Sequence, residues 1–500
     1  MARMQIAGPS TTLDELHHCI HGLREEIRVL KEQLRLALRR QFGASSEAFC
    51  ADQLSLLELT DVAVVITEPE ESNDTPSPRK SRTTRQAVIV NRDTPVERIE
   101  VDLDEAAKIC NCCGGTLHRI GEDCSYQVEL IPAQTKVIET ARPKYGCRGC
   151  ETGVKQAPLP AQPIPKSMAS ASLLAYLIVS KYVDHIPLNR LEQILKRHGI
   201  ILPRSTQCDW LMACATLLKP LVASMRSDLL KSPQIFTDDT ILPLQNDQAS
   251  RNSLIQARLW VYATQPRTGP PIVLYDFTRT REKSGPQTFL RGYRGYVQAD
   301  AYGGYDGLYA AGAKEVACMA HCRRYFFEAS ESEVTPGPAH HVLTQIGELY
   351  RLERAIKHNR HKQRKKQRRL HAKPVLKRLY RWLQAQRSKH LPKGKFGKAV
   401  NYALNHWQAL TRYCEAGYLE IDNNYSEREM RPIALGRKNY LFTGSERGGE
   451  AAAIFYSLVE SAKANRLNLH AYLTDVLTRM PAAKAHDLNA LLPYRWQPTE

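Results

Sequence analysis

The sequence contains no apolar run long enough to cross a bilayer. Its densest apolar stretch, LLAYLIV at 173–179, is soon followed by Lys181, whereas a membrane span needs about 20 such residues. The N-terminal stretch MARMQIAGPSTT lacks the apolar core of a signal peptide, so we expect a cytoplasmic protein without a membrane partner. In that compartment the 13 cysteines are expected to be reduced or bound to metal.

Acidic residues are absent between Glu353 and Glu415, although the chain has 52 of them. The interval holds 19 lysines and arginines, so the remaining chain carries a net charge of only −1. A block of one sign favours a polyanion partner, and we predict DNA. The alternative is a basic segment that only raises solubility. The predicted phosphate contacts in this block are Arg364, Lys365, Lys366, Arg368 and Arg369.

Apolar residues recur at steps of three and four near the N-terminus, at Leu13, Leu16, Ile20, Leu23, Ile27, Leu30 and Leu34. This pattern predicts a coiled coil over residues 13–41, which would join at least two copies of the chain. The alternative is one amphipathic helix packed on its own domain. Residues 67–86, rich in Pro, Ser and charge, are expected to form a disordered linker.

Two CxxC pairs follow the linker. Cys110 and Cys113 lie in CNCCGG, and Cys147 and Cys150 lie in CRGC. Two such pairs can supply four thiolates in tetrahedral geometry, so residues 90–157 are expected to form a module with one structural Zn²⁺. The alternative is a set of unrelated buried or redox cysteines.

Residues 165–230 contain three helical patterns, in which Gly199 interrupts the second and Ser205 can cap the third. Short helices around a glycine turn fit a helix-turn-helix-like DNA-binding unit. A plain three-helix packing module fits the pattern equally well.

The character of the chain changes at residue 233. Three β-rich runs, a short helix, a strand and another strand leading into a helix follow one another up to residue 330. This is the ribonuclease-H-like order, and it implies a mixed sheet with helices on both faces. We therefore expect a multidomain α/β protein.

Two acids occupy this predicted sheet. Asp238 lies on its first strand and Asp300 at the end of its fourth, where their carboxylates can hold Mg²⁺. Asp239 faces the opposite way, because side chains alternate along a strand. A third acid could come from the stretch IDNNYSEREMRP at 421–432, through Glu427 at a helix start. The alternative is a capping box in which Asn424 caps the helix and Glu427 reaches back to it. Glu429 should point away, and Pro432 should end or kink the helix.

The motifs TDDT, VQADAYGGY, CMAHCRRYFFE and EIDNNYSEREMRPIALGRKNYLFTGSERGGE resemble those of the insertion sequence 66 transposases. The CxxC pairs, FGASSE and the PLNRLE helix extend the resemblance to about residues 13–480. It places the family's catalytic acids on Asp238, Asp300 and Glu427. The first motif departs from the common His-Ala-Asp-Glu-Thr-Pro and reads Phe-Thr-Asp-Asp-Thr-Ile.

The resemblance implies a DDE transposase (named for its two Asp and one Glu) with two Mg²⁺ or Mn²⁺ ions per active site. Its partners would be DNA, in the form of the terminal inverted repeats and the target, and further copies of the chain. Accessory proteins encoded by the same element are a further candidate partner. The catalytic core would comprise residues 233–330 and 416–480, separated by a helical basic insertion at 331–415 and followed by a tail at 481–500. Further predicted DNA contacts are Arg431, Arg437 and Lys438. A zinc-containing regulator without catalysis, or a nuclease or resolvase that does not join ends, are the alternatives.

Overall fold

The structure is a computed structural model that describes residues 135–146, 154–246, 253–333 and 336–498. Its first element is a hairpin of β1 (Lys144–Gly146) and β2 (Val154–Gln156), which pair antiparallel on either side of the second CxxC pair. The predicted coiled coil, the linker and the first CxxC pair lie outside the described residues.

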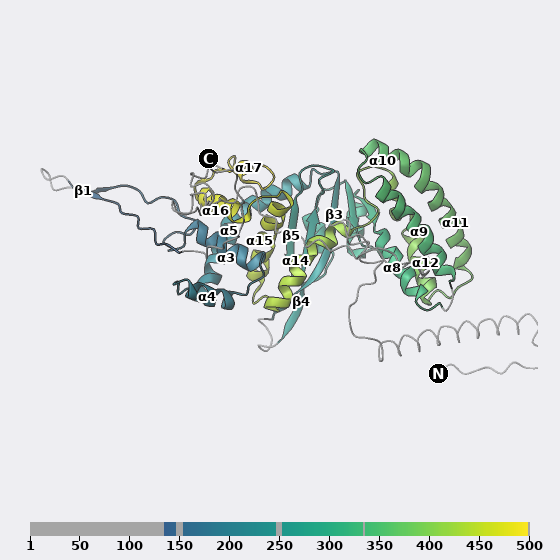
Figure 1. The fold of residues 1–500 in the computed structure, drawn as a ribbon, viewed down its shortest axis with the longest axis horizontal. Helices are drawn as coiled ribbons and strands as arrows, with labels where there is room; N and C mark the ends of the chain where they lie inside the picture. Colours follow the sequence, from purple (N-terminus) through teal and green to yellow (C-terminus); the bar gives the residue numbers. More distant parts are fainter. Residues whose placement is uncertain (1–134, 147–153, 247–252, 334–335, 499–500) are drawn as a thin grey trace, which may run out of the picture. The chain divides into compact units, whose positions relative to one another are not determined.

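A five-stranded mixed sheet forms the centre of the described chain (Figure 1). Its strands are β3 (Gln234–Gln245), β4 (Leu254–Ala263), β5 (Val273–Thr278), β6 (Tyr296–Ala299) and β7 (Lys314–Ala317). They lie in the order β5-β4-β3-β6-β7, with β3, β4 and β5 antiparallel and β6 and β7 parallel to β3. The predicted mixed α/β sheet is therefore confirmed.

Helices that precede and follow the sheet in the sequence share its hydrophobic core. Before it lie α3 (Ala171–Tyr182), α4 (Leu188–Arg197) and α5 (Arg204–Leu229), and after it α14 (Asn424–Tyr440), α15 (Glu446–Ala464), α16 (Leu469–Arg479) and α17 (Leu488–Leu491). Short α6 (Ser284–Phe289) and α7 (Asp306–Ala310) connect the strands. Buried serines of α15 tie it to β5, since Ser457 and Ser461 accept hydrogen bonds from the backbone of Tyr275 and Val273.

The three helices before the sheet belong to the same hydrophobic core as the sheet. Helix α3 packs against α16, and α5 packs against α15. A packing role is therefore what the structure shows for residues 165–230, and DNA binding by them stays a prediction. Ser205 does not cap the third helix, because α5 begins one residue earlier, with Pro203 at the cap position.

By length and composition alone, α5 could cross a membrane, and it is the one such helix in the described ranges. It carries charges at Asp209, Lys219 and Arg226, and several of its apolar side chains, among them Leu211, Leu218 and Leu221, lie in the core. These features are those of a core helix.

A second group of helices separates β7 from α14. It consists of α8 (Met319–Ser330), α9 (Pro338–Ala355), α10 (His361–Gln367), a π turn (Arg368–Ala372), α11 (Lys373–Arg387), α12 (Lys395–Asn405) and α13 (Trp407–Thr411). Their buried side chains, such as Ile346, Leu379 and Val400, lie outside the core cluster of the sheet. The acid-free block therefore folds as helices with their own apolar interior.

Candidate active site

Asp238 and Asp239 on β3 face opposite sides of the sheet, as alternation requires. Asp239 is 3% exposed and lies 3.0 Å from Arg258 and 2.8 Å from Arg281. Two guanidinium groups thus neutralise it. Asp238 accepts only the backbone N–H of Asp239, at 2.8 Å, among the hydrogen bonds of the described residues.

Asp300 follows β6 directly, beside Asp238, because β6 is the parallel neighbour of β3. Its side chain is 26% exposed, and Arg281 lies 3.9 Å from one of its oxygens. The guanidinium of Arg281 also stacks on Tyr302, 4.2 Å from the ring centre. Arg281, in the connection between β5 and α6, therefore lies beside both Asp239 and Asp300.

Glu427 lies in the first turn of α14, and its position is fixed by the residues before it. Asn423 is fully buried and donates its side-chain N–H to the carbonyl of Thr237, 3.0 Å away, next to Asp238. Asp422 accepts hydrogen bonds from the backbone and side chain of Asn424, both at 3.2 Å. These bonds hold the helix start against β3.

The structure does not contain the alternative capping box. The cap position is occupied by Asn423, not Asn424, and no side-chain hydrogen bond caps the helix. Of the two predicted effects of Pro432, ending the helix is wrong, because α14 continues through it to Tyr440, and a kink stays a prediction. Proline removes one backbone donor, and the remaining bonds on either side preserve the helix.

The charges of Asp300 and Glu427 act on the buried carboxyl group of Asp238. Burial, and then the neighbouring carboxylate of Asp300, raise the pKa of Asp238 to about 8, with Glu427 contributing in the same direction. Burial also raises the pKa of Asp300. No lysine or arginine among the described residues forms an ion pair with Asp238 or Glu427. A buried carboxyl group such as Asp238, without a basic partner and close to further carboxylates, fits a bound divalent cation, so these residues are suited to hold Mg²⁺.

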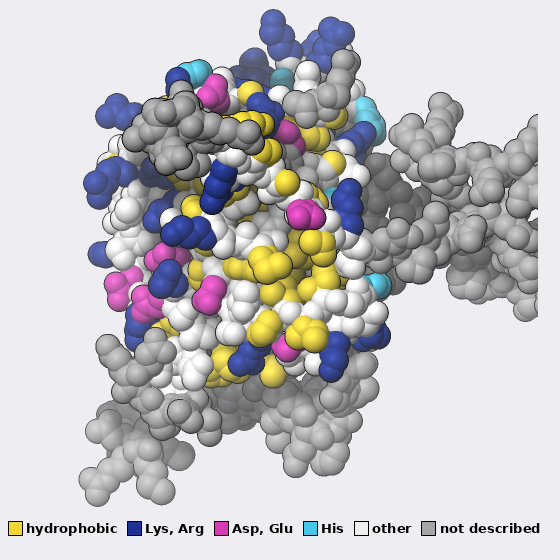
Figure 2. All heavy atoms as spheres, turned by 90° about the vertical axis from the view of Figure 1, so that its left-hand side faces the viewer, with side chains coloured by type: hydrophobic (Ala, Val, Ile, Leu, Met, Phe, Trp, Pro, Cys, Tyr) yellow, Lys and Arg dark blue, Asp and Glu magenta, His cyan; other side chains and the backbone are white. Residues whose placement is uncertain are grey.

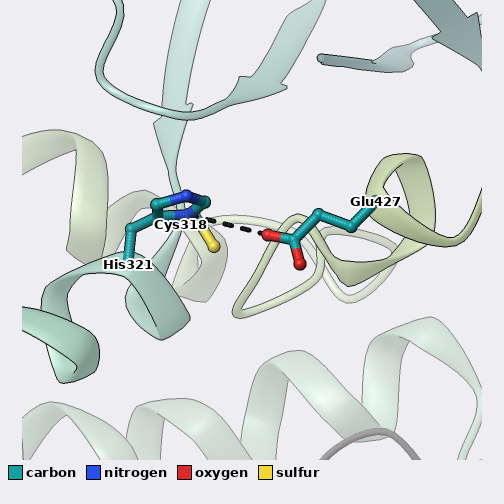
Figure 3. Close-up of side chains that lie close together, drawn as sticks. All are labelled: Cys318, His321 and Glu427. Atoms are coloured by element: carbon teal, nitrogen blue, oxygen red, sulfur yellow. Dashed lines mark ion pairs between the residues drawn. The ribbon is translucent and has the colours of Figure 1, made fainter. Parts of the chain in front are cut away.

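His321 is a site residue that the patterns of the sequence did not single out (Figure 3). Its Nδ1 lies 3.8 Å from Oε1 of Glu427, and neither atom has a hydrogen-bond partner. Cys318, at the start of α8, completes a group whose ligand atoms lie within 4.8 Å of one another. The signal was present in the motif CMAH, where a Cys-x-x-His spacing follows a strand.

Glu429 points away from this group, as predicted from helical geometry. It lines a pocket of about 420 Å³ together with His185, Glu460 and Lys463. Burial, and then the charge of Glu460, raise its pKa to about 7. Two residues of one motif thus face different surroundings.

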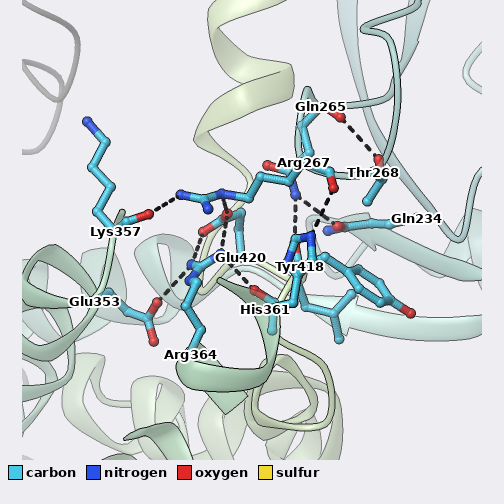
Figure 4. Close-up of polar contacts among 12 residues, drawn as sticks. Gln234, Gln265, Arg267, Thr268, Glu353, Lys357, His361, Arg364, Tyr418 and Glu420 are labelled. Carbon is cyan, nitrogen blue, oxygen red and sulfur yellow. Dashed lines mark hydrogen bonds and ion pairs between the residues drawn. The ribbon is translucent and has the colours of Figure 1, made fainter. Parts of the chain in front are cut away.

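Two of the predicted phosphate contacts are wrong. Arg364 and Arg368 are 1% and 0% exposed, so DNA cannot reach their guanidinium groups. Arg364 lies 3.1 Å from Glu353 and 2.8 Å from Glu420, and Arg368 lies 2.7 Å from Glu353. Figure 4 shows the part of this network around Arg364, with Glu353, Glu420 and Arg267, which lies 3.1 Å from Glu420.

The other candidates differ in exposure. Lys365, Lys366 and Arg369 are exposed in the basic block, and Arg431 and Lys438 are exposed on α14. Arg437 is half-buried and donates to the carbonyl of Ile241 and to Thr240, so it supports the sheet. The face drawn in Figure 2 carries basic side chains mixed with acidic and hydrophobic ones.

The predicted zinc ligands Cys110, Cys113, Cys147 and Cys150 lie outside the described residues. Their binding of zinc stays a prediction. One comparison with known proteins concerns this part of the chain. The family model described as the zinc-finger binding domain of transposase IS66 matches residues 107–151, which contain all four cysteines.

Three further family models match the chain. The model of the Transposase IS66 family matches residues 166–451, and so includes Asp238, Asp300 and Glu427. The IS66 C-terminal element matches residues 457–494, and the model described as Transposase C of IS166 homeodomain matches residues 29–99.

Known proteins also align with this chain over most of its length and most of their own. The uncharacterized protein y4jD of Sinorhizobium fredii is 32% identical over 97% of this chain and 96% of its own length. The uncharacterized proteins y4hP and y4qI of the same organism are each 31% identical, over 93% and 99% of this chain and 88% and 90% of their own lengths. On these matches, the chain belongs to the IS66 family of transposases.

Proposed function

We propose that this transposase is a DDE enzyme, which binds the ends of its insertion sequence, cleaves a phosphodiester there and joins the 3′-hydroxyl to target DNA. What supports the proposal is that Asp300 follows β6, the parallel neighbour of the strand that holds Asp238, and that the charges of Asp300 and of Glu427, at the start of α14, both raise the pKa of Asp238. The strand order β5-β4-β3-β6-β7, with β3 antiparallel to β4 and parallel to β6, supports a ribonuclease-H-like core.

Each residue of the site has a distinct part in this proposal. Asp238, Asp300 and Glu427 would hold two Mg²⁺ or Mn²⁺ ions. Such ions, when bound, activate a water or 3′-hydroxyl and stabilise the leaving oxygen of a phosphodiester. Asn423 fixes the start of α14 against Thr237, and so sets the distance of Glu427 from the sheet. Arg281 keeps Asp239 neutralised on the opposite side of β3.

The proposal is tested by incubating the protein with Mg²⁺ and DNA carrying the terminal inverted repeats of its element. We expect both cleaved ends and joined products. Asp300→Asn should bind the ends but form neither product, whereas the matched control Asp306→Asn, at an exposed position of α7, should form both. Cleavage without joining would identify a nuclease or resolvase, and binding without cleavage by the unchanged protein would identify a regulator.

The exposed cations of the basic block are proposed to bind DNA phosphates without sequence choice. Replacing Lys365, Lys366 and Arg369 by glutamine should reduce the log–log salt slope of binding by up to about 0.9 per lost contact. Arg466 and Lys484, exposed outside the block, provide a control pair whose replacement should leave the slope unchanged. Equal slopes for all three proteins would mean that this face of the block does not meet DNA.

The zinc module is proposed to hold one Zn²⁺ through its four cysteines. Reduced, freshly purified protein should contain about one zinc per chain by metal analysis, and Cys147→Ser should lose it, because three thiolates no longer close the tetrahedral site. The exposed Cys208 of α5 gives a control, since Cys208→Ser should keep the metal. Zinc-free wild-type protein would contradict the assignment.

The predicted coiled coil is proposed to join chains into dimers or larger oligomers.

A further inference from the structure

We propose that Cys318, His321 and Glu427 form a second kind of metal site, which binds a thiophilic divalent cation such as Zn²⁺ and thereby inhibits the enzyme. The inhibitory part rests on the proposed function, because the site would share Glu427 with the proposed Mg²⁺ site. The binding part rests on the geometry of the three side chains alone (Figure 3).

The chain brings the first two ligands together through local structure. Strand β7 ends at Ala317, Cys318 occupies the cap position of α8, and His321 lies in the first turn of that helix. Residues three apart at such a helix start lie on the same side. Helix α14 then supplies Glu427 from the opposite direction.

The distances suit coordination after a small adjustment. The three ligand atoms lie within 4.8 Å of one another, whereas ligands in a tetrahedral zinc site are about 3.5 Å apart, given metal–ligand bonds of about 2.0–2.3 Å. A rotation of the Glu427 side chain, which is 30% exposed, can close the difference. The side chain of His321 is 24% exposed, although the ligand atoms themselves are buried, so an ion would enter by rotation of His321 or Glu427.

The ligand atoms are also available. Nδ1 of His321 and Oε1 of Glu427 are buried and have no hydrogen-bond partner, which is a costly arrangement that a cation would relieve. Sγ of Cys318 accepts the backbone N–H of Asn423 at 3.2 Å. Such a donor stabilises a metal-bound thiolate, and the thiol proton would pass to water when the metal binds.

The ligand types determine which ion is bound. A set of sulfur, imidazole nitrogen and carboxylate oxygen selects Zn²⁺ or Co²⁺, whereas Mg²⁺ prefers oxygen alone. Three protein ligands leave a fourth position open, as in zinc sites that take water. An occupied site would withdraw the Glu427 carboxylate from Asp238 and Asp300, so Zn²⁺ should oppose Mg²⁺.

Co²⁺ titration of the full chain, with its cysteine module already loaded with zinc, tests the binding directly. One additional Co²⁺ should bind per chain and give a thiolate-to-cobalt charge-transfer band. Cys318→Ser should lose that band, and His321→Ala should weaken Co²⁺ binding by at least about tenfold. Cys322→Ser, at another buried cysteine of α8, should keep both the band and the affinity. Any cobalt taken up by the module would appear equally in every variant.

The same variants test the inhibition. In cleavage assays with fixed Mg²⁺, Zn²⁺ beyond the module's one equivalent should inhibit the wild type and Cys322→Ser at equal concentrations. Each of Cys318→Ser and His321→Ala, compared with its own activity without added Zn²⁺, should need at least about tenfold more Zn²⁺. A charge-transfer band that survives in Cys318→Ser would overturn the site, even if no cleavage were found. If the variants that lose cobalt binding were as sensitive to Zn²⁺ as the wild type, the inhibitory role would be wrong, and the metal site itself would stand.

Discussion

Glu427→Gln is expected to fold and bind DNA, but to lose both cleavage and joining by about a thousandfold or more. The substitution keeps the shape of the side chain and removes the charge that would hold a metal. Loss of several kcal/mol of metal-dependent stabilisation corresponds to about that factor. Because no side-chain hydrogen bond of Glu427 caps α14, the helix start should persist in the variant.

Glu429→Gln is the matched control for this prediction. It changes the same residue type two positions further along α14, where the side chain faces Glu460 and Lys463. We expect cleavage and joining to be retained, measured on the same DNA ends. An active Glu427→Gln protein together with an inactive Glu429→Gln protein would show that the carboxylate of Glu427 is structural and that the chemistry lies elsewhere.

Arg368→Ala is expected to destabilise the protein by about 3–5 kcal/mol, the range for breaking a buried ion pair. Its guanidinium binds both oxygens of Glu353 and the carbonyls of Tyr413, Ala416 and Leu419. Alanine would leave these buried acceptors without their donor. The unfolding midpoint should fall in denaturant and heat titrations, and Arg368→Lys should restore only part of it, since lysine lacks the planar fork.

The neighbouring Arg369 provides the control, because it is exposed and Arg369→Ala should change stability by no more than about 0.5 kcal/mol. Hydrogen exchange should locate the effect of Arg368→Ala in residues 413–421, which lead directly to α14. Equal unfolding midpoints for the two alanine variants would show that the network adds nothing to stability.

Several features of the site could be predicted because they depend on local rules. The alternation of strand side chains separated Asp238 from Asp239, and the two indeed have different surroundings. Helical geometry likewise separated Glu427 from Glu429. The succession of strands and helices from 233 to 330 predicted the mixed sheet. The catalytic roles of these residues stay a prediction.

Other features depended on partners far away in the sequence. The acid-free block suggested that its arginines meet DNA, yet Arg364 and Arg368 are neutralised by Glu353 and Glu420, which lie just outside the block. Charge counted along a window cannot identify such partners, because ion pairs form in space. Similarly, the cap position of α14 is decided by the bond from Asn423 to Thr237, 186 residues away.

The sequence by itself determined the family and the order of the elements, and it predicted three candidate acids, because motifs and periodicities are properties of neighbouring residues. Only the tertiary structure decided which cations are buried, that α14 continues through Pro432, and that Cys318 and His321 face Glu427. The burial of Arg364 and Arg368 and the position of Glu427 opposite Cys318 and His321 result from contacts between separate helices and loops, whereas α14 passes Pro432 through the backbone bonds on either side of it. The energies of these contacts and bonds exceed the local preferences that a sequence window reveals.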